Sequence, residues 1–167
     1  MDLIKETGAG LTTANSYADV DDGDLYHEGR LFVIDWTSAS DDDKEAALIW
    51  ATKLIDKLVA WNGIVVTKTQ ALAWPRQSVL NAEGYYLSQT IVPQDLIDAT
   101  CEFARYLITS DRSASSASGL KSFKAGSLAI EFDKYDRESI MPKSVWILIR
   151  QYGSKSGSTG NRMLERM

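Results

Sequence analysis

The sequence contains one cysteine and one histidine among its 167 residues. A single cysteine, Cys101, excludes an intramolecular disulfide and fits a reducing compartment. One cysteine and one histidine cannot supply the ligands of an ordinary zinc site. No G-x-S-x-G motif is present for His27 to serve, so we expect a surface or capping role for it rather than that of a general base. The sequence therefore predicts no enzyme, no cofactor and no metal site.

Long apolar runs and an excess of basic residues are also absent. No apolar run approaches the roughly 20 residues of a membrane span, and the first ten residues lack the basic start and apolar core of a signal peptide. The formal net charge is −5, whereas nucleic-acid binding by phosphate neutralisation usually uses a basic face. We therefore expect no membrane partner, and no appreciable binding of single-stranded DNA at physiological salt.

Two short motifs resemble ligand loops but fail in detail. When Gly23 of "DVDDGD" is taken as the sixth residue of an EF-hand loop, the first and third positions are Ala18 and Val20 instead of acids. Acids at the start of a helix explain this segment better, because the helix dipole favours negative charge there. The "GAG" stretch from Gly8 to Gly10 lacks the lysine and the preceding strand of a phosphate-binding loop.

The remaining composition is that of a soluble globular domain, with 44% hydrophobic and 25% charged residues. The pattern predicts a mainly α fold, a small helical bundle with a β-hairpin arm and flexible termini. Its expected parts are an extended N-terminal arm at 1–15, a helical domain at 16–151 with a linker at 110–119 and a β-hairpin arm at 120–133, and a flexible C-terminal tail at 152–167.

Within the domain, helices are expected at about 16–28, 41–61, 94–109 and 142–153, with residues 64–93 mostly loop. Ser16 and Ser40 are the candidate N-caps of the first two. On the second helix Ile49 falls on the polar side and Trp50 at its edge. Exposed apolar residues and a projecting hairpin suggest contacts between subunits, for which the candidates are Ile49, Trp50, Phe123, Ile130 and Phe132.

The stretch "TQALAWPR", Thr69 to Arg76, allows two interpretations. Trp74 and Arg76 can form a stacking platform for single-stranded nucleic acid, with Lys68, Tyr85 and Tyr86 as the nearest further cation and aromatics. Such sites usually interleave several aromatics with several cations, which this stretch does not. The favoured interpretation is structural, with Trp74 and Pro75 anchoring the loop to the core.

Four stretches together resemble the head-tail connector or adaptor proteins of tailed bacteriophages: "ANSYADVDDGDLYH", "KEAALIWATKLIDKLVAWNGIVVTKTQALAWPR", "EGYYL" and "VPQDLIDATCEFARYL". The resemblance implies a ring, commonly of about twelve copies, beneath the portal protein at the virion neck, assembled in the cytoplasm of the host bacterium. The ring would extend the channel for double-stranded DNA without binding it specifically, and would carry the next connector or tail-completion protein. In that role the tail residues Arg162, Met163, Leu164 and Arg166 would contact the portal.

Relatives with this pattern also carry the label of DnaT-like single-stranded DNA-binding proteins. A single-stranded DNA-binding replication protein is therefore the alternative function. Ring formation with portal binding would support the connector, and salt-sensitive binding to single strands without a ring would support the alternative.

Overall fold

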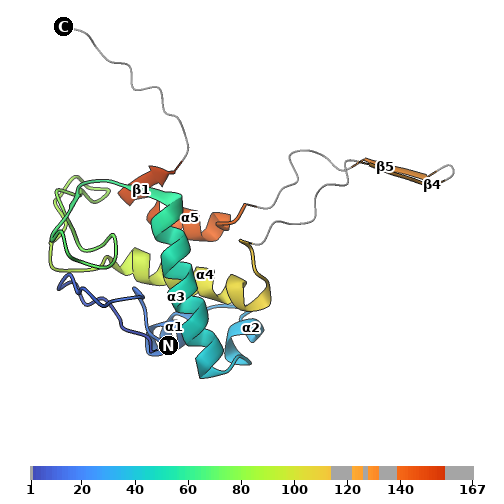
Figure 1. Cartoon of the computed structure of the whole chain (residues 1–167), viewed down its shortest axis with the longest axis horizontal. Helices are drawn as coiled ribbons and strands as arrows, with labels where there is room; N and C mark the ends of the chain where they lie inside the picture. Colours follow the sequence, from blue (N-terminus) through green and yellow to red (C-terminus); the bar gives the residue numbers. More distant parts are fainter. Residues whose placement is uncertain (1, 114–121, 126–127, 132–138, 157–167) are drawn as a thin grey trace, which may run out of the picture.

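The computed structural model describes residues 2–113, 122–125, 128–131 and 139–156. In these ranges the chain is mainly helical, with three short antiparallel strand pairs (Figure 1). This confirms the mainly α fold class with a β-hairpin that the sequence predicts. The elements follow one another as α1 Val20–Glu28, α2 Ile34–Thr37, α3 Asp41–Leu58, β1 Val59–Trp61, β2 Ile64–Val65, β3 Arg76–Gln77, α4 Gln94–Thr109, β4 Ser122–Ala125, β5 Leu128–Glu131, α5 Lys143–Ile149, a 3-10 turn Arg150–Tyr152 and β6 Gly153–Lys155.

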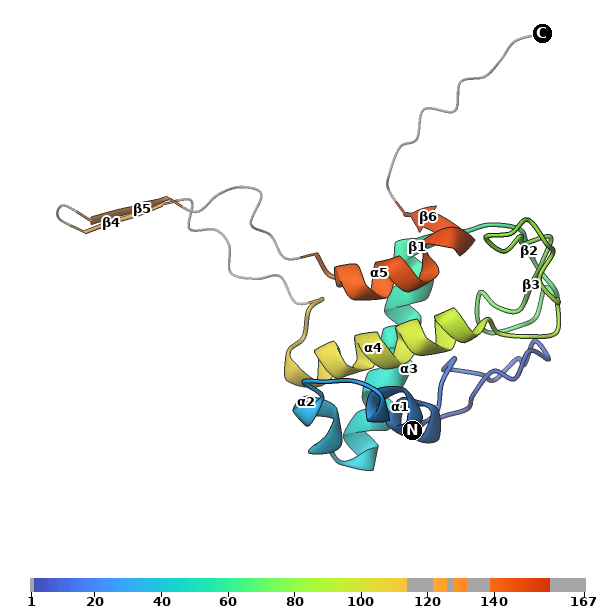
Figure 2. The ribbon, with the colours of Figure 1, turned by 180° about the vertical axis from the view of Figure 1, so that it is seen from behind.

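The core lies where α3 crosses α4, with α5 on α4 and with α1 and α2 beside the start of α3 (Figure 2). Ser40 begins α3 as predicted, because its hydroxyl accepts the backbone N–H of Asp43 at 3.2 Å. Each fully buried aliphatic or aromatic side chain in such a core contributes about 1.5–3 kcal/mol. The fully buried large hydrophobic residues are Tyr17, Trp36, Leu48, Ile55, Trp74, Leu96, Phe103 and Ile149.

Helix α3, predicted over about 41–61, is shorter than expected and ends at Leu58. Val59 is extended, and β1 pairs antiparallel with β6, with Ala60 opposite Ser154. Gly153 permits this approach, since a Cβ there would lie 2.7 Å from the carbonyl oxygen of Ala60. The segment predicted as a flexible tail from residue 152 therefore begins with a buried tyrosine and a strand.

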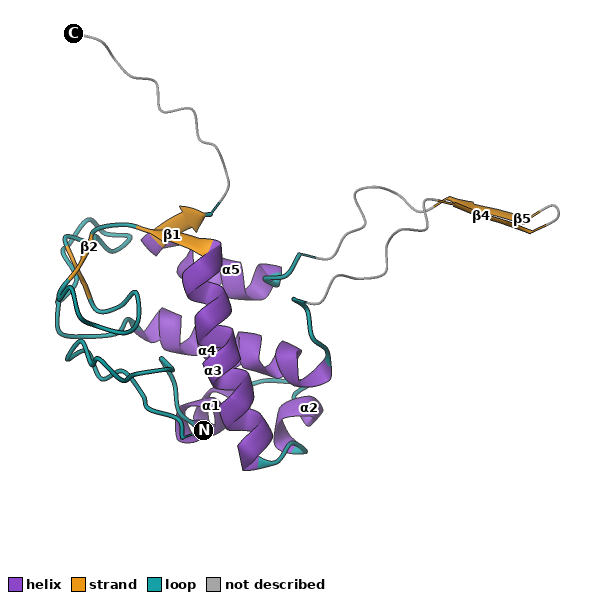
Figure 3. Ribbon diagram, viewed as in Figure 1, coloured by secondary structure: helices purple, strands orange, loops and turns teal. Residues whose placement is uncertain are grey.

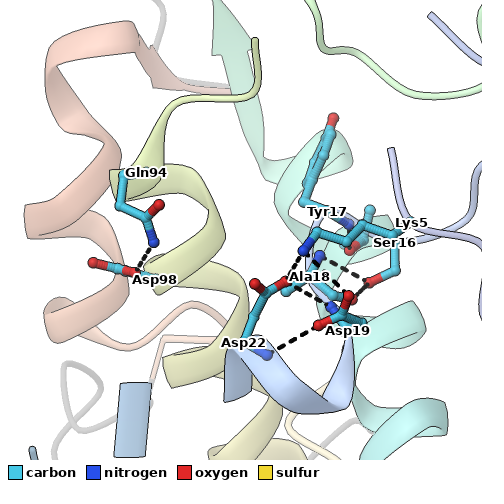
Figure 4. A network of polar contacts seen from close by, with 9 residues as sticks. Lys5, Ser16, Tyr17, Ala18, Asp19, Asp22, Gln94 and Asp98 are labelled. Atoms are coloured by element: carbon cyan, nitrogen blue, oxygen red, sulfur yellow. Dashed lines mark hydrogen bonds and ion pairs between the residues drawn. The ribbon is translucent and has the colours of Figure 1, made fainter. Parts of the chain in front are cut away.

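The first helix begins at Val20 rather than after Ser16. Asp19 is its N-cap, and the carboxylates of Asp19 and Asp22 each accept the other's backbone N–H at 2.9 Å. Lys5 pairs with both carboxylates and ties the N-terminal arm to the helix start (Figure 4). Ser16 instead forms an isolated β-bridge with Lys5, which joins the end of the arm to its beginning.

Residues 64–93, predicted to be mostly loop, contain two short strands, β2 and β3, which pair antiparallel (Figure 3). Asp56 of α3 fastens this loop: its carboxylate accepts the backbone N–H of Ala73 at 2.9 Å and the hydroxyl of Tyr17 at 2.7 Å. The Tyr17 hydroxyl in turn accepts the backbone N–H of Trp74. Burial raises the pKa of both Asp56 and Tyr17 above their ordinary values.

The predicted hairpin is present as β4 and β5, whose register pairs Phe123 with Ile130. Most of the predicted linker at 110–119, the hairpin turn at 126–127 and Phe132 lie outside the described residues. So does the end of the predicted tail, residues 157–167, which includes Arg162, Met163, Leu164 and Arg166.

Candidate functional site

Arginine and aromatic side chains from three separate segments meet at the C-terminal end of α4. The loop between α1 and α2 lies against this end, where Arg105 donates to the carbonyl oxygen of Phe32 at 3.2 Å. Arg30, from the same loop, donates to the carboxylate of Glu102 at 3.0 Å. We call the group the arginine–aromatic cluster, and its members are Tyr26, Arg30, Phe32, Arg105, Tyr106 and Arg112.

The guanidinium groups of the cluster lie over tyrosine rings. Arg30 is 5.5 Å from the ring centre of Tyr26 and donates to its hydroxyl at 2.9 Å. Arg105 and Arg112 lie 4.6 and 5.5 Å from the ring centre of Tyr106. Such cation–π contacts are worth about 0.5–1 kcal/mol at exposed sites. Burial raises the pKa of Tyr26 to about 12, so its phenol stays neutral around pH 7.

A fully buried carboxylate holds two of these arginines in place. One oxygen of Glu102 accepts from Arg30 and, at 3.3 Å, from Arg105. Side chains of Arg30 and Arg105 are 39% and 12% exposed. Arg105 therefore acts mainly inside the protein, where it positions Phe32, while Arg30 keeps a part of its surface open to solvent.

The loop that carries Phe32 is fixed from both sides. Trp36 of α2 is fully buried against Gly23 of α1. A Cβ added at Gly23 would lie 2.2 Å from the Trp36 ring, so only glycine fits there. The indole N–H of Trp36 also donates to Asp24 at 2.8 Å. Phe32 itself has φ of 61° and is 88% exposed. A bulky residue in this left-handed region costs on the order of 1–3 kcal/mol and is found mostly at functional sites.

His27 lies under this cluster and not at the surface, so the predicted surface or capping role is wrong. Its ring is buried between Tyr26 and Trp36, and Nε2 lies 3.2 Å from the carbonyl oxygen of Cys101. Helix α1 turns this face toward α4, which buries the imidazole. Burial lowers the pKa of His27, which favours the neutral ring.

The charges of the chain are segregated along the sequence. Of its 23 acidic residues 12 lie in residues 1–50, whereas 15 of its 18 basic residues lie in residues 51–167. A net charge of −5 averages over this asymmetry and hides it. Such asymmetry between parts of a chain is a recognised sign of interaction with nucleic acid or membrane, but it does not locate the cluster, since Arg30 and Phe32 lie in the acid-rich part.

The structure does not assemble the stacking platform considered for Trp74 and Arg76. Trp74 is fully buried, with its ring 5.8 Å from that of Trp61, and Pro75 is buried beside it, across a cis peptide bond. The guanidinium of Arg76 donates to three backbone carbonyls, those of Asn62, Gly63 and Ala73. Both residues therefore brace the loop.

Exposed tyrosines remain on the outer side of this loop. Tyr85 and Tyr86 project there, and Tyr86 lines a shallow depression of about 450 Å³ together with Gln77, Ser78, Leu87, Ser88 and Gln89. None of these lining residues is basic. We call this area the tyrosine loop surface, and it offers aromatic rings without the cations that the arginine–aromatic cluster supplies.

The residues predicted to contact other subunits differ in how exposed they are. Ile49 is only 7% exposed, so the buried face of α3 is wider than the apolar stripe indicates and this side chain is not available to a second subunit. Trp50 is 42% exposed. For Phe123 and Ile130 the structure gives strand and register alone.

Other residues considered as ligands serve the fold. The carboxylate of Glu6 accepts the backbone N–H groups of Gly8, Gly10 and Leu11 at 2.8–2.9 Å, so the "GAG" amides are occupied from within. Cys101 is fully buried, which raises the pKa of its thiol. Among the described residues no group of three or more His, Cys, Asp or Glu side chains is placed to hold a metal ion. In the same ranges no helix is both long and apolar enough to cross a membrane.

Comparison with known families overturns the resemblance to phage connectors. A family model described as "Putative DnaT-like ssDNA binding protein" matches residues 1–167. No curated protein and no solved structure matches the chain.

The connector expectation is wrong because the matching family is described by binding to single-stranded DNA and not by a place in the virion. The expectations that depended on it are wrong for the same reason: the ring beneath a portal, the portal and tail partners, the passage of unbound double-stranded DNA and the location at the virion neck. Because the match spans the whole chain, the protein belongs to the family described as "Putative DnaT-like ssDNA binding protein".

Proposed function

We propose that the protein binds single-stranded DNA through the arginine–aromatic cluster. The proposed role is binding, with no catalytic step. Proteins that bind single strands without reading sequence combine cations that follow the phosphates with aromatic rings on which bases stack. The observation that carries the proposal is Phe32, an 88% exposed ring whose backbone Arg105 holds beside Arg30 and Tyr106.

The exposure of Phe32, Arg30 and Arg105 determines the role that we propose for each side chain in DNA binding. Phe32 offers a free ring face to a base, and stacking of this kind is worth about 1–3 kcal/mol per base. Arg30 is the exposed cation for a phosphate, and its guanidinium plane, which lies over Tyr26, is a second stacking surface. Arg105 is a positioning residue, because most of its surface is buried.

The net charge of −5 does not oppose this proposal, contrary to the expectation from composition. Phosphates respond to charges within about one Debye length, which is roughly 10 Å at 0.1 M salt. Inside the cluster two arginines, Arg30 and Arg105, share one buried carboxylate, that of Glu102. These three side chains therefore carry a net positive charge, although the chain as a whole is acidic.

The variant Phe32→Gly separates binding from folding. Glycine adopts φ of 61° without strain and the lost ring is almost fully exposed, so the stability of the fold should stay equal or rise. The loss of one stacked base, about 1–3 kcal/mol, should weaken binding about fivefold to a hundredfold. Fluorescence anisotropy of a labelled oligothymidylate measures the affinity, and thermal unfolding checks the fold.

The matched control is Tyr85→Gly, which removes a ring that is 73% exposed from the tyrosine loop surface. It should leave the affinity unchanged. If Tyr85→Gly weakens binding and Phe32→Gly does not, the strand lies on the tyrosine loop surface and the proposal is wrong. If the unmutated protein shows no salt-sensitive binding to single strands, the proposed function itself is wrong.

A further inference from the structure

The C-terminal part of the described chain carries charge of one sign only. Residues 139–156 contain three basic residues, Lys143, Arg150 and Lys155, and no acidic residue. All three are exposed. None of them forms an ion pair with any residue of the described ranges, so their charges are not neutralised by nearby carboxylates.

Aromatic and apolar side chains accompany these cations. Trp146, on α5, is partly exposed, and Lys155 of β6 lies over its ring at 5.5 Å from the centre. Ile147, the next residue along α5, is exposed as well. Lys155 is held in place because it pairs with Val59 across the β1–β6 ladder. The outer side of α5 thus combines a ring with cations, which is the combination that single strands require.

This surface is connected to the arginine–aromatic cluster. Arg112 lies over Tyr106 of the cluster, and its guanidinium donates to the carbonyl oxygens of Ser139 and Ile140 at 2.9 and 3.2 Å. These two residues directly precede α5, which packs on α4. A strand that leaves the cluster at Arg112 therefore meets the beginning of α5 next, as Figure 2 allows the reader to follow.

We propose that the outer face of α5, with Lys143, Trp146, Arg150 and Lys155, is a second contact zone for the same single strand of DNA. The inference rests on the proposed function, and it adds a direction: the strand runs from the α1–α2 loop across the end of α4 and along α5 to β6. Phosphates contact Lys143 and Lys155, and Trp146 offers the exposed part of its ring to a base.

Charge variants test this zone without disturbing the core. The test variant carries two substitutions, Lys143→Gln and Lys155→Gln, and loses two exposed cations. The matched control carries Lys53→Gln and Lys68→Gln, which remove the same charge from two exposed lysines of α3 and the following loop. Each lost phosphate contact lowers the salt slope for a single strand by about 0.7. The test variant should therefore lose about 1.4 in slope and bind about tenfold or more weakly near 0.1 M salt, whereas the control should match the unmutated protein.

The oligothymidylate for this titration has about 20 nucleotides, enough to span both zones, since a single binding domain usually covers about 4–16. Photocrosslinking of a bromodeoxyuridine-substituted strand to the unmutated protein is the second readout. The crosslinked peptides should include the one that contains Trp146.

The outcomes separate the two proposals. If the unmutated protein binds, but the test variant equals its control and no crosslink falls in residues 139–155, the second zone is overturned and the cluster stands. If the test variant loses binding while Phe32→Gly binds normally, α5 is a site and the cluster is not. If the unmutated protein binds no single strand, both proposals are overturned.

Discussion

Replacing Glu102 with glutamine should weaken the fold and strengthen the binding of single-stranded DNA. Glu102 is fully buried, and one of its oxygens accepts from Arg30 at 3.0 Å and from Arg105 at 3.3 Å. Bonds to charged groups are worth about 1.5–3 kcal/mol, roughly twice their neutral equivalents. Glutamine keeps the acceptor oxygen but removes the negative charge that compensates Arg30 and Arg105, so the fold should lose about 1.5–3 kcal/mol, the value of one bond to a charged group. Because Arg30 is partly exposed, the lower end of this range is expected.

The effect on binding has the opposite sign. Removing the carboxylate takes away a negative charge beneath the arginines that we assign to the phosphates. For a phosphate about 8 Å away, Coulomb's law gives roughly 0.5 kcal/mol at a dielectric constant of 80 and roughly 2 kcal/mol at 20. Either value makes binding at least about twofold tighter, and a dielectric constant between the two gives a severalfold gain.

Urea denaturation and anisotropy with a labelled oligothymidylate, on the same preparation, measure both effects. Glu83→Gln is the control, because it removes one negative charge from an exposed position in the loop before α4. It should change neither quantity appreciably. If Glu102→Gln binds DNA more weakly, in step with its stability, then Glu102 acts by holding the arginines in position and the electrostatic reasoning is refuted.

Two predictions concern stability alone. Trp74→Ala should cost about 3–5 kcal/mol, because it empties a fully buried site between Trp61 and Tyr152; a denaturation midpoint that does not move would contradict this placement. Stability should also fall as the pH drops below about 6.5, since burial lowers the pKa of His27 and the unfolded chain takes up the proton first. The other charged groups that act on the His27 ring are Arg30, Arg105 and Glu102. If the free energy of unfolding of His27→Phe falls with pH as steeply as that of the unmutated protein in this range, His27 is not the cause.

The parts of the fold that depend on neighbouring residues were predictable from the sequence. The start of α3 follows from Ser40 and the acids behind it, and α4 was predicted with its observed bounds, because Pro93 precedes an apolar pattern of helical period. The end of α3 was missed because it depends on a distant residue. Val59 to Trp61 leave the helix to pair with β6, for which Gly153 provides the space.

The candidate site could not be predicted for the same reason. Its six residues come from 26–32, 105–106 and 112, and no spacing rule connects these segments. Phe32 in particular is an ordinary apolar residue in the sequence, and its positive φ and exposure appear only in the structure. The stretch that does look like a stacking motif, "TQALAWPR", contains a fully buried tryptophan, Trp74. An aromatic beside a cation is thus informative only once its exposure is known.

The acidic composition follows from where the carboxylates are used. Asp19 and Asp22 cap α1, and Glu6 closes the loop at Gly8. Asp56 and Asp95 fasten the loop and the C-terminal turn to the helices through partly buried hydrogen bonds. These charges lie on or inside elements that the fold requires. The basic residues of 139–156 remain at the surface and form no ion pair within the part of the chain that the structure describes. A protein can therefore carry a net negative charge and still present a basic path, because screening limits a phosphate to the charges within about 10 Å of it.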